Sequence, residues 1–117
     1  MDANIQTAAS LLRRASYNLQ TRIRELHSDE QAIRSHVSNK EKSISHDLFE
    51  TGTRMAVGNT AGSGQYLVRH IYDLRKRRQQ MKAVADQKVE YDEREIQHLQ
   101  RQSSRLDELA RTLEMWH

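Results

Sequence analysis

The side chains best suited to binding chemistry in this sequence form the basic run Arg75-Lys76-Arg77-Arg78. The run lies in the stretch from Arg69 to Lys88, which holds seven basic and two acidic residues. Clustered Lys and Arg side chains bind phosphates, so the stretch predicts a nucleic-acid-contacting regulator as one alternative function. On a helix, however, four consecutive side chains spread around the whole circumference, and the sequence turns acidic from Glu90 to Glu95. We therefore favour a solvated helix face.

Other residues with chemical potential lack the spacing that their chemistry needs. No two of the six His lie three or four residues apart, and there is no Cys, so we expect no metal site. Only His27 and His98 form a conceivable pair across two helices. The glycine-rich window contains no Lys and is not a phosphate-binding loop. Because no nucleophile has a plausible base nearby and paired helices offer no cleft, we expect neither an enzyme nor a cofactor.

The positions of the glycines indicate where the helices that carry these residues begin and end. All four glycines fall between Gly52 and Gly64, the chain has no Pro, and about fifty glycine-free residues lie on either side. Glycine supplies the backbone angles that reverse a chain and is unfavourable inside a helix. The sequence therefore predicts one domain, residues 1–117, with a helix over about 2–57, a turn over about 58–64 and a helix over about 65–116.

Apolar residues recur at steps of three and four along both arms, which is typical of helices that pack along one stripe. In the second arm they fit a heptad repeat that begins at Leu67. We predict an all-α fold, a long antiparallel two-helix coiled-coil hairpin. The predicted seam residues are Leu12, Leu19, Leu26, Ile33, Leu48, Leu74, Met81, Leu99, Leu106 and Leu109.

Folding at the glycine window pairs residue i with roughly residue 122 − i, which sets apolar residues opposite apolar residues at most levels. Leu26 then lies near Ile96, and Ile5 lies near Trp116. Polar residues interrupt the seam where Glu41 faces the surroundings of Met81. Each such position forfeits burial worth about 1.5–3 kcal/mol. We infer that a second copy or a different protein supports the hairpin.

Two alternatives to a simple hairpin remain open. Ser28-Asp29-Glu30-Gln31 reads as a helix-capping box, so a break near Ser28 would give a three-helix bundle. The hydrophobic content is only 36%, so a disordered chain that folds on a partner is the other alternative.

Several residues are candidates for partner binding. Trp116 near the chain end either closes the rod against Ile5 or anchors a partner. The candidate set is Met55, Val57, Arg75, Arg77, Arg78 and Trp116. The sequence contains no apolar run long enough to cross a bilayer and no secretory signal, so we expect a cytoplasmic protein.

The second arm begins Tyr-Leu-Val-Arg-His-Ile-Tyr-Asp-Leu-Arg-Lys-Arg-Arg-Gln-Gln-Met-Lys at Tyr66. In this pattern it resembles the coiled-coil stalk family of bacterial flagellar and type III secretion export. The resemblance implies a charged helical hairpin that sits in an export ATPase ring and handles chaperones, and it carries no functional residue over. We expect a non-catalytic protein–protein interaction module: a scaffold, stalk, chaperone or assembly subunit. The alternatives are the nucleic-acid regulator using Arg69 to Lys88 and a structural subunit that assembles as a homo-oligomer.

Overall fold

The computed structural model describes residues 2–56 and 64–116, which form two helices, α1 (Asp2–Ala56) and α2 (Gly64–Glu114). The predicted all-α, two-helix fold is confirmed, and the predicted helix ends differ from these bounds by two residues at most. Val57 and the predicted turn at about 58–64 lie outside the described residues, except Gly64, where α2 begins.

Helix α1 is continuous at Ser28, where the capping box allowed a break, and also at Gly52. It passes Ser28 without interruption, so the three-helix alternative is wrong. No Gly or Pro lies near Ser28, and a Ser followed three residues later by Gln occurs readily in a polar helix. Gly52 also lies inside α1, four residues before its end at Ala56.

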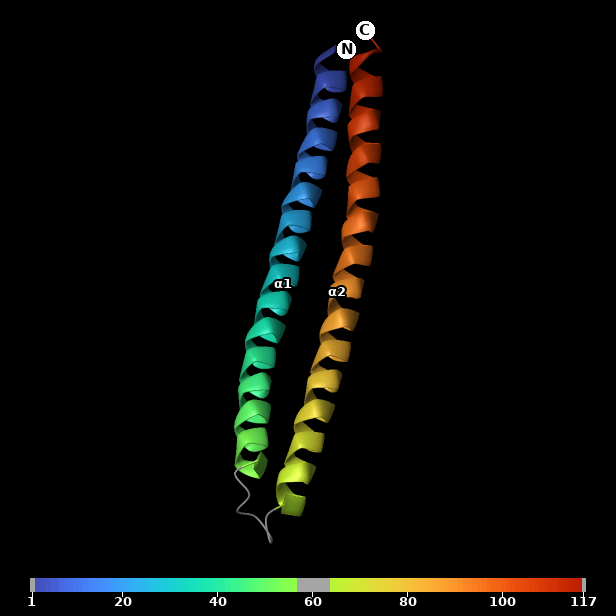
Figure 1. Ribbon diagram of the computed structural model, residues 1–117. Coiled ribbons are helices and arrows are strands. Elements are labelled where there is room, and N and C mark those ends of the chain that lie inside the picture. The colour runs from blue at the N-terminus through green and yellow to red at the C-terminus, as the bar shows by residue number, and fades with distance from the viewer. Residues whose placement is uncertain (1, 57–63, 117) are drawn as a thin grey trace. The chain divides into compact units, whose positions relative to one another are not determined.

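The chain divides into two compact units, each made of one segment of α1 and one of α2. Unit 1 comprises Met1–Glu30 and Glu90–His117. Its two helical segments lie side by side and run in opposite directions (Figure 1). The core of unit 1 is an apolar cluster of Ile23, Leu26, Ile96 and Leu99, against which Leu19 packs. Leu26 is the most buried member of this cluster and is only 2% exposed.

A buried polar layer adjoins this cluster in unit 1. The hydroxyl oxygens of Ser16 and Ser103 are 2.7 Å apart, and Gln20 Nε2 donates to Ser103 Oγ at 2.8 Å. Nearer the helix ends, Arg13 donates from Nε and Nη2 to the two carboxylate oxygens of Glu114, each at 2.9 Å. This forked pair joins the first turns of α1 to the last turn of α2.

Unit 2 comprises Gln31–Val89 and is also an antiparallel pair of helical segments (Figure 1). Leu67 and Leu74 of α2 are buried, as is Thr51 of α1. The remaining seam positions of the unit are half-buried. These are Ile33, Val37, Glu41, Ile44, Leu48, Met55, Ile71, Arg78, Met81, Ala85 and Val89.

The predicted register agrees with contacts in both units. In unit 1, Leu26 and Ile96 belong to the same buried cluster. In unit 2, Glu41 contacts Arg78 and Lys82, which lie on either side of Met81. The pairing derived from the glycine window therefore holds in each unit.

The predicted heptad of α2 holds from Leu67 to Ala85. Beyond Ala85, one of its two positions remains in the seam, where Leu99 is buried and Leu106 half-buried, and the other is wrong. The residues that continue it, Lys88, Gln102 and Leu109, are exposed, and Leu109 is 48% exposed. The side chains that lie in the seam in their place are Val89, Ile96, Ser103 and Ala110. Each follows a predicted heptad position by one residue. One step of four replaces a step of three after Ala85, because a straight helix with 3.6 residues per turn drifts away from a strict seven-residue repeat.

Candidate partner-binding surface

An apolar groove lies between α1 and α2 in unit 2 and has a volume of about 430 Å³. Its apolar lining is Ile33, Val37, Met81, Val84 and Ala85. We call this the unit 2 groove. Its volume falls in the range of about 300–1,000 Å³ that is usual for ligand pockets. The groove is large enough to accept an apolar side chain from another molecule.

The rim of the unit 2 groove is polar and basic. It consists of His36 from α1 and Gln80, Arg77 and Lys88 from α2. Arg77 and Lys88 are exposed, and neither forms an ion pair with another of the residues that the structure describes. An apolar lining with cations at its edge favours a partner that presents an apolar side chain among carboxylates.

Local sequence explains why the groove exists. On α1 the seam passes through Ile33, Val37 and Glu41 in two successive steps of four residues. On α2 it makes the same double step through Met81, Ala85 and Val89. A step of four in place of three locally unwinds a coiled coil. The side chains at the middle of the two steps, Val37 and Ala85, are short, so they leave the space between the helices open.

Next to the groove, charged residues occupy the seam. Glu41 Oε1 accepts a hydrogen bond from Lys82 Nζ at 2.6 Å and one from Arg78 Nε at 3.3 Å. The hydrogen bond from Lys82 is the main reason that the pKa of Glu41 lies below its ordinary value, and Arg78 adds to the effect. The Glu41 side chain is 28% exposed, so this is a half-buried cluster that replaces apolar packing.

The structure separates the predicted partner-binding residues. Arg75 and Arg77 are exposed, and of the two only Arg77 lines the groove. Arg78 is half-buried and donates a hydrogen bond from Nε to Glu41 Oε1 at 3.3 Å, so part of its donor capacity is used within the chain. Met55 is half-buried in the seam of unit 2. Val57 lies outside the described residues.

Trp116 does not act as a packed staple. It follows the end of α2, its side chain is 69% exposed, and Ile5 is half-buried. The ends of the two helices in unit 1 are joined instead by the Arg13–Glu114 pair, whose hydrogen bonds raise the pKa of Arg13. Trp116 is left available as an exposed aromatic side chain.

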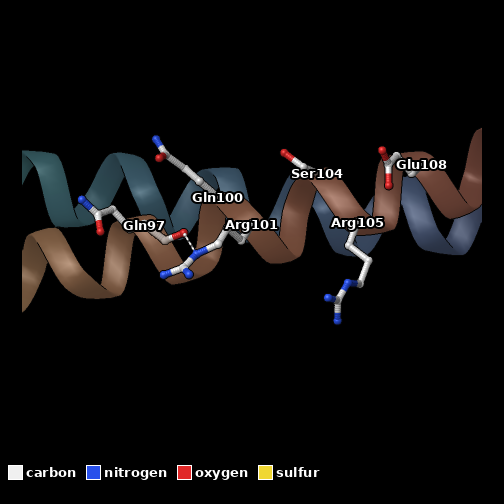
Figure 2. A pocket seen from close by; sticks show the side chains of 6 residues that line it. All are labelled: Gln97, Gln100, Arg101, Ser104, Arg105 and Glu108. Carbon is white, nitrogen blue, oxygen red and sulfur yellow. Dashed lines mark hydrogen bonds between the residues drawn. The ribbon is translucent and has the colours of Figure 1, made fainter.

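A second hollow lies on the outer face of α2 in unit 1 and differs in kind. It is lined by Gln97, Gln100, Arg101, Ser104, Arg105 and Glu108, all from one helix. Figure 2 shows these side chains spread along the helix surface, with Arg101 Nε donating to the carbonyl oxygen of Gln97 at 3.3 Å. An open polar face of a single helix offers no apolar burial, so the unit 2 groove is the better candidate site.

The spacing of the His residues in the sequence predicts no metal site. His27 and His98, the one conceivable pair, are both exposed. Residues 2–56 and 64–116 contain no group of three or more His, Asp or Glu placed to hold a metal ion. In the same residues, neither helix has a segment with the length and hydropathy of a membrane span.

Sequence reasoning missed the groove because it treated the heptad as continuous. Val84 and Lys88 both line the groove, and neither belongs to the predicted candidate set of partner-binding residues. The signal was present in the register, which sets Val37 opposite Ala85. Two short side chains in facing positions predict unfilled space.

Taken together, these features define an antiparallel helical pair with an open lateral groove in unit 2, which has an apolar lining and a basic rim. No protein-family model, no curated protein and no solved structure matches the chain.

Proposed function

We propose that this chain is a non-catalytic protein–protein interaction module that binds a partner helix in the unit 2 groove. The observation that carries the proposal is the combination of an apolar lining formed by both helices with the exposed cations Arg77 and Lys88 at its edge. Helix-in-groove binding uses apolar anchors at steps of three and four residues, which is the spacing at which Met81, Val84, Ala85 and Lys88 line the groove.

The half-buried seam of unit 2 supports this proposal. A two-helix seam gains stability in proportion to the apolar area it removes from water, at about 25 cal/mol per Å². The seam residues around the groove remain half-exposed, so a partner helix that covers them adds burial that the pair lacks by itself. This is the role of a scaffold, stalk, chaperone or assembly subunit, and the resemblance of the second arm to secretion stalks agrees with it.

A cross-linking experiment tests this function. A photo-reactive amino acid replaces Val84 in the full chain, and the matched control carries it in place of Tyr72, an exposed residue of α2 outside the groove. We expect the Val84 variant to cross-link to a discrete protein in an extract of the native host. The purified partner should then bind the chain and lose affinity by about tenfold or more for Val84→Asp. Cross-linking of equal pattern and yield at both positions, or equal affinity for Val84→Asp, would reject the groove as the binding site.

The nucleic-acid alternative is supported by Arg75, Lys76 and Arg77, which are exposed. It is weakened because Arg78 and Lys82 of the same stretch are occupied by Glu41. Phosphate contacts give binding that weakens steeply with salt. Duplex binding that disappears in an Arg75→Ala, Arg77→Ala double variant, with Val84→Asp unaffected, would favour this alternative over the groove.

A further inference from the structure

We propose that the occupant of the unit 2 groove is a second copy of this chain, which inserts Tyr91 into it. The inference rests on the proposed function, since it names the partner for the same groove. The inference is based on Tyr91, an exposed aromatic residue in an acidic segment of the chain. The ring is complementary to the apolar lining of the groove, and the acidic segment is complementary to its basic rim.

Tyr91 is 69% exposed in unit 1, as are the other five aromatic residues of the chain to a similar extent, and it is the one that lies in an acidic segment. It stands in the segment from Glu90 to Glu95, which holds four carboxylates and one cation, Arg94. The segment itself has a net negative formal charge, although Arg94 pairs with Glu90 and Arg22 of α1 lies 3.9 Å from Glu95. A Tyr ring provides a large apolar body with a polar tip, which suits a groove that is apolar within and wet at its edge.

The unit 2 groove is complementary to this segment in polarity and in charge. Its lining is apolar, and Arg77, Lys88 and His36 supply basic side chains at its edge. Opposite charges on two surfaces steer them together and fix their register. The stretch from Arg69 to Lys88 is strongly basic and the stretch from Glu90 to Glu95 is acidic, so each copy offers one half of the match.

When two α2 helices associate in opposite directions, each copy can insert its Tyr91 into the groove of the other. Tyr91 follows Val84 by seven residues, about two turns along the continuous helix α2. When two such helices run in opposite directions about a two-fold axis, Tyr91 of each copy approaches Val84 of the other. Such an isologous contact closes at the dimer and produces no open fibre.

The absence of Cys from the sequence permits a direct test of this contact. Single variants Val84→Cys and Tyr91→Cys are purified, mixed and oxidised. We expect a disulfide-linked heterodimer, because bonded cysteines need Cα atoms within about 7 Å. The matched control mixes Val84→Cys with Tyr72→Cys, whose Tyr is similarly exposed, and should give much less product. Equal yields from the two mixtures would overturn the proposed contact.

Sedimentation equilibrium provides the second test. The unmodified chain should be a dimer, and Tyr91→Ser should weaken dimerisation by about tenfold or more, as expected for a buried Tyr anchor. Tyr72→Ser should leave the dimer unchanged. Lys88→Glu should weaken dimerisation and also reduce its sensitivity to salt. These residues are exposed, so none of the variants removes core packing.

The outcomes separate this inference from the function on which it rests. A chain that stays monomeric at every concentration, or a dimer indifferent to Tyr91→Ser, overturns self-association through the groove. If Val84 then cross-links to a different host protein, the interaction function stands and only the identity of the partner changes. If neither a second copy nor another protein is captured at Val84, both proposals fail.

Discussion

Units 1 and 2 are built from the same two helices in the same antiparallel register, yet their seams differ. In unit 1 the four residues of the apolar cluster, Ile23, Leu26, Ile96 and Leu99, are all buried. In unit 2 no residue of 31–50 or 75–89 is fully buried. Helical propensity and pairing direction are shared, so the difference comes from the side chains at the seam. The seam of a helical pair is therefore closed or open according to the side chains at a few positions.

The polar seam residues of the two units illustrate this difference. In unit 1, Ser16 and Ser103 hydrogen-bond to each other and let the helices approach closely, and the longer Glu30 is buried as well. In unit 2, Glu41 and Arg78 keep their charged heads near water while their stems lie along the seam. The difference therefore lies in burial, since these polar residues of unit 1 are buried whereas Glu41 and Arg78 stay half-exposed.

The largest expected effect tests the closed seam of unit 1. Leu26→Ala should lower the free energy of unfolding by about 3–4 kcal/mol, because it removes buried contacts and leaves a cavity. Leu48→Ala, the same change at a half-buried seam position of unit 2, should cost only about 1–2 kcal/mol, since part of that side chain already contacts water. Urea denaturation followed by circular dichroism measures both values.

Leu109→Ala is the matched control within unit 1. Leu109 is half-exposed, so its truncation should cost less than about 1 kcal/mol. Equal losses for Leu26→Ala and Leu48→Ala would contradict the contrast between the units.

The buried serine layer should produce a smaller effect. Ser103→Ala removes the hydroxyl that contacts both Ser16 and Gln20, so it should cost about 1–2 kcal/mol. The neighbouring Ser104 is exposed, and Ser104→Ala should change the free energy of unfolding by no more than about 0.5 kcal/mol. Thermal denaturation of the two variants compares them directly, and similar melting temperatures would show that the layer contributes no specific stability.

Gly52 permits a change that stabilises the weaker unit. It lies inside α1, and a Cβ added there would meet no atom within 4 Å. Gly52→Ala should therefore raise the free energy of unfolding by about 0.5–1 kcal/mol, because Gly is a poor residue for a helix interior. The reciprocal change at an exposed position of α2, Ala83→Gly, should lower it by a similar amount. A loss of stability in Gly52→Ala, measured by urea denaturation, would contradict a helical Gly52.

The sequence was sufficient to predict the fold because its signals were local and repeated. The absence of Pro and the confinement of glycine to one window identified two helices, and the apolar spacing identified their shared seam. The register followed from the turn, and it placed Leu26 near Ile96 and Glu41 near Met81 correctly. What failed was one of the two heptad positions beyond Ala85, the one that contains Leu109, because a change from a step of three to a step of four leaves no mark in composition.

The candidate site was harder to predict than the fold. Arg77 was identified from its charge, but Arg78 beside it is bound to Glu41, and adjacent charges in a sequence do not reveal which one has a partner. Val84 was recognised as a residue flanking the seam. Its role in the groove depends on Val37 and Ala85 being too short to fill the space, and that is a property of packing in three dimensions.

The smallest expected effect concerns the charged seam of unit 2 and depends on pH. The pKa of Glu41 is lowered in the folded chain, chiefly by the hydrogen bond from Lys82. A carboxyl group with a depressed folded pKa contributes stability above its unfolded pKa, and the contribution is lost as the pH falls through the folded pKa. Stability should therefore decline below about pH 4.5, the ordinary pKa of this group. In Glu41→Gln this part of the decline should be absent, because the amide does not titrate.

Glu50→Gln supplies the control for this comparison, since Glu50 is exposed and its partner is His46 on the same helix. Melting temperatures of the three proteins between neutral and acidic pH give the comparison. If Glu41→Gln and Glu50→Gln follow the unmodified chain equally, the cations at Arg78 and Lys82 do not hold the two helices through Glu41. The half-buried packing of Ile33, Met81 and Leu48 would then be what keeps unit 2 together. Because Ile33 and Met81 also line the groove, the same titration shows whether the open seam depends on charge or on apolar contact.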